Sequence, residues 1–282
     1  MPLYFNLYLL YSASRSVILE STVAIASSNE VPVSMELYAS PMISCTSAYP
    51  GNVEYGIEQV DVMVLFGGSI LCGGDILAQA MRNQIAKKYI IVGGAGHTTE
   101  TLRQLVHREY PQIVTENLPE AEVFSCYLKE VYQLEADALE TRSSNCGNNI
   151  TNLIALLEEK NITWKSIILC QDATMQHRME AGLHKYASEK LIINYASYQA
   201  KVCYQEAELQ YQIQIHGMWK IDRYINLLMG EIPRLTDNAE GYGPNGKKFI
   251  CHVDIPENVR EAFELLKTVY GEETRAANPL YA

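Results

Sequence analysis

The stretch that decides the fold is Val60-Asp61-Val62-Met63-Val64-Leu65-Phe66-Gly67-Gly68, and Tyr89-Ile90-Ile91-Val92-Gly93-Gly94 repeats its pattern. Each is a nearly continuous apolar run that ends in two glycines, which is typical of a strand buried on both faces. Between the two runs, apolar residues recur with the period of a helix: Ile76, Leu77, Ala80, Met81 and Ile85. This strand–helix–strand unit predicts two parallel strands joined by a right-handed crossover.

The same alternation continues along the chain. Helical patterns cover Thr99–Glu109, 120–133, 147–159 and the segment that holds Met175, Met179 and Leu183. Strand patterns cover Ala138–Glu140, 166–169 and 191–195. Five strands with helices between them predict an α/β fold with a Rossmann-like, doubly wound, mostly parallel sheet, which we place at residues 55–200.

The two ends of the chain have a different character. Beyond about residue 199 strand signals stop. A helix is predicted over 218–229, ended by Gly230 and Pro233, and a last helix over 256–270 after the turn-rich loop 240–246. Residues 201–282 are therefore expected to form a small helical region that packs on the sheet edge.

Residues 1–54 are a poorly patterned N-terminal extension. The first fifty residues hold ten Ser, one Arg and no Lys, with no sustained helical or strand period. A partner-binding or targeting tail is one interpretation. We favour a poorly ordered extension, or an artefact of the gene start or of a frameshift. The apolar run at residues 3–10 holds Asn6 and has no basic flank before it, so it is a poor signal peptide.

Composition narrows the classes of function. Hydrophobic residues make up 48% of the 282 residues and the net charge is −11, which favours a packed core and argues against nucleic-acid binding. The seven cysteines form no C-x-x-C pair, so neither a disulfide framework nor a zinc ribbon is predicted. The sequence holds no apolar stretch of about 20 residues, so no membrane span is predicted. We expect a cytoplasmic protein with a small-molecule ligand, and the oligomeric state stays open.

Glycine-rich or polar turns follow four of the predicted strands. Ligands of open parallel sheets bind beyond the carboxyl ends of the strands, so these turns are expected to converge on one site. The candidate ligand-binding residues that they supply are Gly67, Gly68, Ser69, Gly93, Gly94, Gly96, His97, Thr98, Ser144, Asn145, Asn149, Gln171, Asp172, Thr174 and Arg178.

Two features of these turns suit an anionic ligand. The glycine pairs let the backbone approach a ligand, and free N–H groups at the start of the next helix can hold an anion. A tight strand-to-helix turn is the simpler interpretation, and the spacing matches neither a P-loop nor G-x-G-x-x-G. Arg178 could bind a carboxylate with two hydrogen bonds, or it could be a surface charge.

Other side chains in the turns have structural and chemical interpretations. Helix capping explains one or two residues of the group Asn145, Asn148 and Asn149. Cys146 at a helix start could be a nucleophile, although no partner base is identifiable. A metal site of His97, His177 and Asp172 lacks the support of an H-x-x-H or H-E-x-x-H helix, so no metal is predicted.

At these motifs the sequence resembles a known family. The matching stretches are 92–99, 140–149, 171–178, 222–235, 241–246 and 252–254, and the resemblance runs from about residue 55 to 270. They resemble the YdcF-like bacterial proteins, which share a domain of unknown function with the envelope-related SanA and ElyC proteins. The resemblance implies a Rossmann-like domain, a small C-terminal helical domain and binding of S-adenosylmethionine, with no settled reaction.

One departure from the family pattern bears on catalysis. The family commonly has Glu-Asn where this chain has Asn148-Asn149. Glu122 and Glu140 are then the candidate carboxylates near the site. Our first hypothesis is a protein that binds S-adenosylmethionine or a similar nucleoside-containing ligand. The alternatives are a hydrolase or transferase of a cell-envelope precursor, with Glu140, Asp172 or His97 in acid–base roles, and a non-catalytic ligand sensor.

Overall fold

A five-stranded, all-parallel sheet lies at the centre of the computed structural model, which describes residues 57–205 and 208–270. The strand order is β3-β2-β1-β4-β5. The strands are β1 (Val60–Phe66), β2 (Ala86–Val92), β3 (Ala138–Glu140), β4 (Ser166–Gln171) and β5 (Leu191–Ala196). The predicted Rossmann-like α/β class is confirmed, while the extension at residues 1–54 lies outside the described residues.

The central position of β1 follows from its composition. It pairs in parallel with β2 on one side and with β4 on the other. Val62, Val64 and Phe66 point to one core cluster, and Met63 and Leu65 point to a second cluster on the opposite face. A strand covered on both faces needs apolar side chains in both directions, which explains the continuous apolar run.

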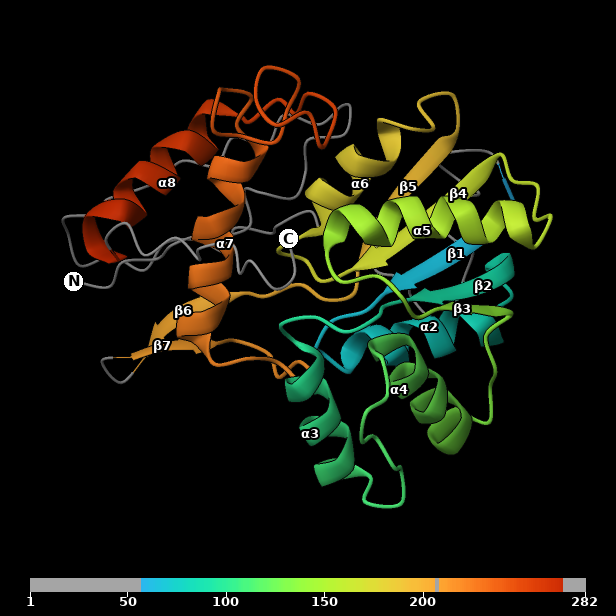
Figure 1. Cartoon of the computed structure of the whole chain (residues 1–282). Coiled ribbons are helices and arrows are strands. Elements are labelled where there is room, and N and C mark those ends of the chain that lie inside the picture. Colours follow the sequence, from blue (N-terminus) through green and yellow to red (C-terminus); the bar gives the residue numbers. More distant parts are fainter. Residues whose placement is uncertain (1–56, 206–207, 271–282) are drawn as a thin grey trace.

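Helices cover the two faces of the sheet, as the predicted doubly wound topology requires (Figure 1). The cluster on one face includes residues of α2 (Cys72–Arg82), α3 (Thr99–Glu109) and α4 (Glu120–Tyr127). The other face packs against α5 (Cys146–Glu159) and α6 (Gln176–His184). The helix predicted over 120–133 is α4 followed by a π-helical turn, η2 (Leu128–Tyr132), after which Gln133 takes a left-handed conformation.

The expectation that strands stop near residue 199 is wrong. A two-stranded antiparallel hairpin follows, formed by β6 (Val202–Gln205) and β7 (Glu208–Tyr211). Each strand has four residues, too few for a clear period in the sequence. Packing decides the conformation instead, because Val202 and Tyr211 lie against a core cluster that includes residues of the next helix.

The predicted end of that helix is also wrong. Helix α7 spans Ile221–Leu235, so it begins three residues later than expected and continues through Gly230 and Pro233. Pro233 lacks the N–H that would bond to the carbonyl of Met229, and the helix continues for only two residues beyond it. Gly230 makes room for a side chain, since a Cβ atom there would lie 2.6 Å from Nη1 of Arg234, which donates a hydrogen bond to the Gly230 carbonyl.

The last helix, α8 (Glu257–Tyr270), begins directly after Pro256 as predicted. In Figure 1, α7 and α8 stand beyond the carboxyl ends of the central strands, and α7 faces α6 across that edge. Within residues 57–205 and 208–270, no helix combines the length and the apolar composition that crossing a bilayer requires. The C-terminal region thus lies where it can close one side of a site at the sheet edge.

Candidate functional site

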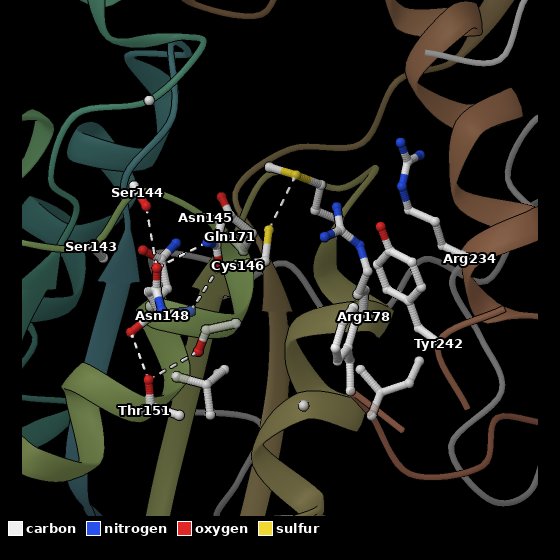
Figure 2. A pocket seen from close by; sticks show the side chains of 18 of the residues that line it. Ser143, Ser144, Asn145, Cys146, Asn148, Thr151, Gln171, Arg178, Arg234 and Tyr242 are labelled. Atoms are coloured by element: carbon white, nitrogen blue, oxygen red, sulfur yellow. Dashed lines mark hydrogen bonds between the residues drawn. The ribbon is translucent and has the colours of Figure 1, made fainter. Parts of the chain in front are cut away.

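A cavity of about 710 Å³ opens at the carboxyl edge of the sheet. Its volume falls within the range of roughly 300–1,000 Å³ that small-molecule sites occupy. One side is the amide wall, which we define as Gly94, Gly96 and residues 144–149. The opposite side is the cationic wall, defined as Arg178, Lys185, Arg234, Tyr242, Lys247 and Phe249. Figure 2 shows Ser144, Asn145 and Asn148 across from Arg178, Tyr242 and Arg234.

The amide wall is organised by the start of α5. Asn145 is the N-cap, and its Oδ1 accepts a hydrogen bond of 2.9 Å from the backbone N–H of Asn148. Its Nδ2 donates to Oδ1 of Asn148, which also accepts a hydrogen bond from the Ser144 hydroxyl. Cys146 and Gly147 line the cavity, and their backbone N–H groups have no hydrogen-bond partner within the described part of the chain. Such helix-start N–H groups are available to an anionic or carbonyl group of a ligand.

Gly94 brings the turn after β2 into contact with the turn after β3. Its N–H donates to the hydroxyl of Ser143 over 3.0 Å, and a Cβ atom at Gly94 would collide with the Ser143 carbonyl oxygen. Gly96 is less confined, because the nearest atom to its Cβ position is 3.4 Å away. The glycine predicted to allow close backbone approach therefore packs against the neighbouring turn, and the same packing fixes that side of the cavity.

Glu120 supplies a carboxylate to the cavity that we did not predict. The first turn of α4 returns to the β2 edge, where the N–H groups of Glu120 and Ala121 donate to the carbonyls of Gly94 and Gly93. Oε1 of Glu120 accepts hydrogen bonds from the hydroxyls of Thr98 (2.8 Å) and Thr99 (2.9 Å). Burial raises the pKa of the Glu120 carboxyl, against the opposing effect of these two hydroxyls.

The Glu120 carboxylate occupies the space that a side chain at Gly67 would need. A Cβ atom at Gly67 would lie 2.5 Å from Oε2 of Glu120 and 3.2 Å from the Cα atom of Gly93. The glycines that end β1 and β2 therefore leave the space that the Glu120 side chain occupies. Gly67 lines the cavity, whereas Gly93 lies behind Glu120 and does not.

Arg178 lines the cavity, but two of its N–H groups already donate hydrogen bonds to a carboxylate. Its Nε and Nη2 donate to the two carboxylate oxygens of Glu231 on α7, over 2.6 and 2.8 Å. The side chains are 13% and 5% exposed, so the pair is largely withdrawn from water. Burial lowers the pKa of the guanidinium, but the charge and the hydrogen bonds of the Glu231 carboxylate raise it. The expected ligand clamp is thus an ion pair that joins α6 to α7.

The rest of the cationic wall comes from α7 and the loop that follows it. Arg234 lies one turn after Glu231, with Nη1 3.7 Å from the Glu231 carboxylate. Nζ of Lys247 lies 5.2 Å from the centre of the Tyr242 ring, and the Phe249 ring meets the same ring edge-on at 5.2 Å. Lys185 on α6 donates to the carbonyl of Lys248, which ties the loop to α6.

Most of the predicted residues lie at the cavity. Those that line it are Gly67, Gly94, Gly96, His97, Thr98, Ser144, Asn145, Asn149, Gln171 and Arg178. Those that do not are Gly68, Ser69, Gly93, Glu122, Glu140, Asp172 and Thr174.

Two of the residues outside the cavity wall hold neighbouring turns in place. The hydroxyl of Ser69 accepts a hydrogen bond of 2.5 Å from the indole of Trp219. Oε1 of Glu140 accepts from the N–H of Arg142 and from Nδ2 of Asn152, so this carboxylate orders the turn before α5. Glu122, two residues after Glu120, is not among the residues that line the cavity.

Asp172 is buried beneath the C-terminal region. Its Oδ1 accepts hydrogen bonds from Thr174 N–H, the Thr174 hydroxyl and the Tyr198 hydroxyl, at 2.7–2.8 Å. Burial raises the pKa of the Asp172 carboxyl. Its Oδ2 is buried and makes no hydrogen bond within the described residues. The contacts that Asp172 does make order the turn before α6, which is a structural role.

The Cys146 thiol and the candidate metal ligands can be placed in the structure. Sγ of Cys146 lies 3.9 Å from Sδ of Met175, and Figure 2 shows this contact between the two walls. Across residues 57–205 and 208–270, no three His, Cys, Asp or Glu side chains come together as metal ligands.

Several residues that line the cavity were not predicted from the sequence, and each has an identifiable reason. Glu120 follows a helix rather than a strand, and Pro119 before it marks only a helix start. Arg234 fell beyond the helix end that we expected at Gly230. Lys247 and Phe249 directly follow the predicted turn-rich loop, so a search of that loop and its next residues for charged and aromatic side chains could have found them.

The fold and the cavity together define the class of protein: a parallel-sheet α/β protein with a ligand-sized site at the carboxyl edge of its strands. Compared with the models of known protein families, the sequence matches none.

Proposed function

We propose that the cavity binds a small nucleoside-containing molecule with a negatively charged group, and that S-adenosylmethionine is the first candidate. The observation that supports this most directly is the amide wall, where open backbone N–H groups and side-chain amides gather at the carboxyl edge of a parallel sheet. The resemblance to YdcF-like proteins is the reason for testing S-adenosylmethionine first. We propose the cytoplasm as the compartment, which suits the six free cysteines among the described residues.

The chemistry of the amide wall suits the parts of such a ligand. The N–H groups of Cys146 and Gly147 can take a carboxylate at the start of α5, and the amides of Asn145 and Asn149 can take ribose hydroxyls. A hydrogen bond to a charged group contributes about 1.5–3 kcal/mol. Two or three such bonds with apolar contacts reach the roughly −8 kcal/mol of a micromolar complex.

Isothermal titration with S-adenosylmethionine, S-adenosylhomocysteine and ATP tests the proposal. We expect a micromolar dissociation constant for at least one of the three. Dissociation constants above about 100 µM for all three would remove the nucleoside proposal.

Two substitutions at Asn145 separate binding from helix capping. Asn145→Ala removes both the amide and the cap and is expected to cost about 1 kcal/mol of stability. Asn145→Ser keeps a capping oxygen but loses the amide group, so its stability should stay near that of the wild type. We expect both variants to bind the nucleoside about tenfold more weakly, from the loss of one hydrogen bond. Unchanged affinity in Asn145→Ser would show that the ligand does not use this amide.

Glu120 favours a second candidate function, the hydrolase or transferase of a cell-envelope precursor. A buried carboxyl with a raised pKa at a cavity wall is suited to general acid–base catalysis. UDP-N-acetylglucosamine, a nucleotide-linked envelope precursor, is the probe. Cleavage by the wild type and not by Glu120→Gln would favour the enzyme. Binding of this probe without its cleavage would favour the non-catalytic ligand sensor.

A further inference from the structure

We infer that the cavity takes a second ligand at the cationic wall: an organic anion that carries an aromatic or apolar group. The inference concerns the site of the proposed function, but it is carried by a different set of residues. It therefore deepens that proposal and can fail separately from it.

The charge at this wall opposes the charge of the whole chain. The chain carries 22 Lys and Arg against 33 Asp and Glu. The residues lining the cavity reverse this balance, with four cations (Arg178, Lys185, Arg234, Lys247) against two carboxylates (Glu120, Glu231). In an acidic protein, a concave site with an excess of cations attracts anions selectively.

The two carboxylates do not cancel this excess at the wall. Glu231 is matched by the bidentate ion pair with Arg178. Glu120 lies on the other side, against Thr98 and Thr99, and burial raises its pKa. Arg234 also lies 3.7 Å from the Glu231 carboxylate. Lys185 and Lys247 form no ion pair with a carboxylate among the described residues, and both line the cavity.

Aromatic rings lie next to these cations at the mouth of the cavity. Phe249 is 56% exposed and Tyr186 is 51% exposed. Both line the cavity, and they are two of the six large hydrophobic side chains that are exposed among the described residues. A single exposed aromatic residue needs no explanation, but two beside a group of lysines at one opening suit a ligand that is both anionic and apolar.

Tyr242 connects the charged and aromatic parts. Lys247 lies over its ring at 5.2 Å and Phe249 packs edge-on against it at 5.2 Å. Figure 2 places Tyr242 between Arg178 and Arg234, on the side of the cavity opposite Asn145. A ligand at the amide wall offers one negative group to the α5 helix start, so Lys185 and Lys247 on the opposite wall are available to a second anion.

Titration of the whole chain with phenyl phosphate tests the inference. Three comparison probes separate the contributions. Benzoate replaces the phosphate by a carboxylate, inorganic phosphate carries the anion without the ring, and benzyl alcohol carries the ring without the charge. Each is titrated with and without saturating S-adenosylmethionine. We expect phenyl phosphate or benzoate to bind at least fivefold more tightly than inorganic phosphate and benzyl alcohol, and to bind equally well in both conditions.

Substitutions at the mouth show where the anion binds. Lys247→Ala is expected to weaken binding of the aromatic anion five- to tenfold, the loss of one charge-assisted contact, with the affinity for S-adenosylmethionine unchanged. Lys160→Ala is the matched control, since it removes the same charge at the far end of α5, a 14-residue helix about 21 Å long.

The outcomes distinguish the two proposals. Failure of both aromatic anions to bind overturns the inference and leaves the nucleoside proposal standing. Binding of the anion alone, lost on Lys247→Ala, supports the inference even if no nucleoside binds. Competition between phenyl phosphate and S-adenosylmethionine overturns it, because one ligand would then span both walls. Equal losses in Lys247→Ala and Lys160→Ala also overturn it, because they place the effect in the overall charge.

Discussion

The amide wall and the cationic wall face each other across one cavity but are held in place differently. The amide wall consists of turns that leave neighbouring strands, and backbone contacts such as Gly94 against Ser143 fix it. The cationic wall consists of long side chains from α6, α7 and the following loop. A buried ion pair, Arg178–Glu231, joins it to the sheet domain. The first wall is therefore sensitive to added volume and the second to lost charge.

Breaking the ion pair is expected to have the largest effect. Glu231→Leu leaves the Arg178 guanidinium buried without its carboxylate, and removing one partner of such a pair costs about 3–5 kcal/mol. The free energy of unfolding, from urea denaturation, measures this cost. The double variant Arg178→Met with Glu231→Leu removes both charges and should recover most of the stability. Equal stability of Glu231→Leu and the wild type would mean that the cationic wall is held by other contacts.

Added volume at the amide wall is expected to have the next largest effect. In Gly94→Ala the new methyl group would meet the backbone of Ser143 and Arg142, which can move little. Overpacking of this kind costs about 1–3 kcal/mol. Gly96→Ala is the matched control, because its methyl group would lie 3.4 Å from its nearest neighbour, an ordinary contact. Thermal unfolding should separate the two variants clearly, and similar melting temperatures would contradict the close contact at Gly94.

The two walls also differ in how far the sequence predicted them. The apolar runs at β1 and β2 fix the sheet, and ligands gather at its carboxyl edge, so residues directly after a strand could be found. Gly94, Asn145 and Gln171 were found in this way and lie at the cavity. Arg178 was found too, but its partner Glu231 lies 53 residues away, and nothing in the local sequence indicates that contact.

The C-terminal region was predicted less well because tertiary contacts override its local signals. Gly230 and Pro233 are ordinary helix-ending residues, yet α7 continues through both, and Arg234 occupies the space that Gly230 leaves. The β6–β7 hairpin has strands too short to show a period. Glu120 reaches the cavity from a helix, outside the rule that ligands lie after strands.

The smallest expected effect concerns a second link between the sheet domain and the C-terminal region. His216 lies just before α7, and its two ring nitrogens are each 2.7 Å from a carboxylate, Asp75 on α2 and Glu109 on α3. Tyr127 and Tyr132 donate hydrogen bonds to the other oxygen of Asp75. Partial burial lowers the pKa of His216, but the hydrogen bonds and charges of Asp75 and Glu109 outweigh it and raise the pKa.

The sign of the pH effect follows from that shift. A histidine whose pKa is higher in the folded state stabilises the fold fully below its unfolded pKa of about 6.5 and loses this contribution as pH rises through the folded pKa. The melting temperature of the wild type should therefore fall more steeply than that of His216→Gln as the pH rises from about 6.5 through the raised folded pKa. The difference should be a few degrees or less, because the site is partly exposed. His107→Gln, which replaces a ring beside the Ile113 carbonyl, is the control and should follow the wild type. Parallel curves for the wild type and His216→Gln would show that the ion pairs of His216 do not stabilise the fold.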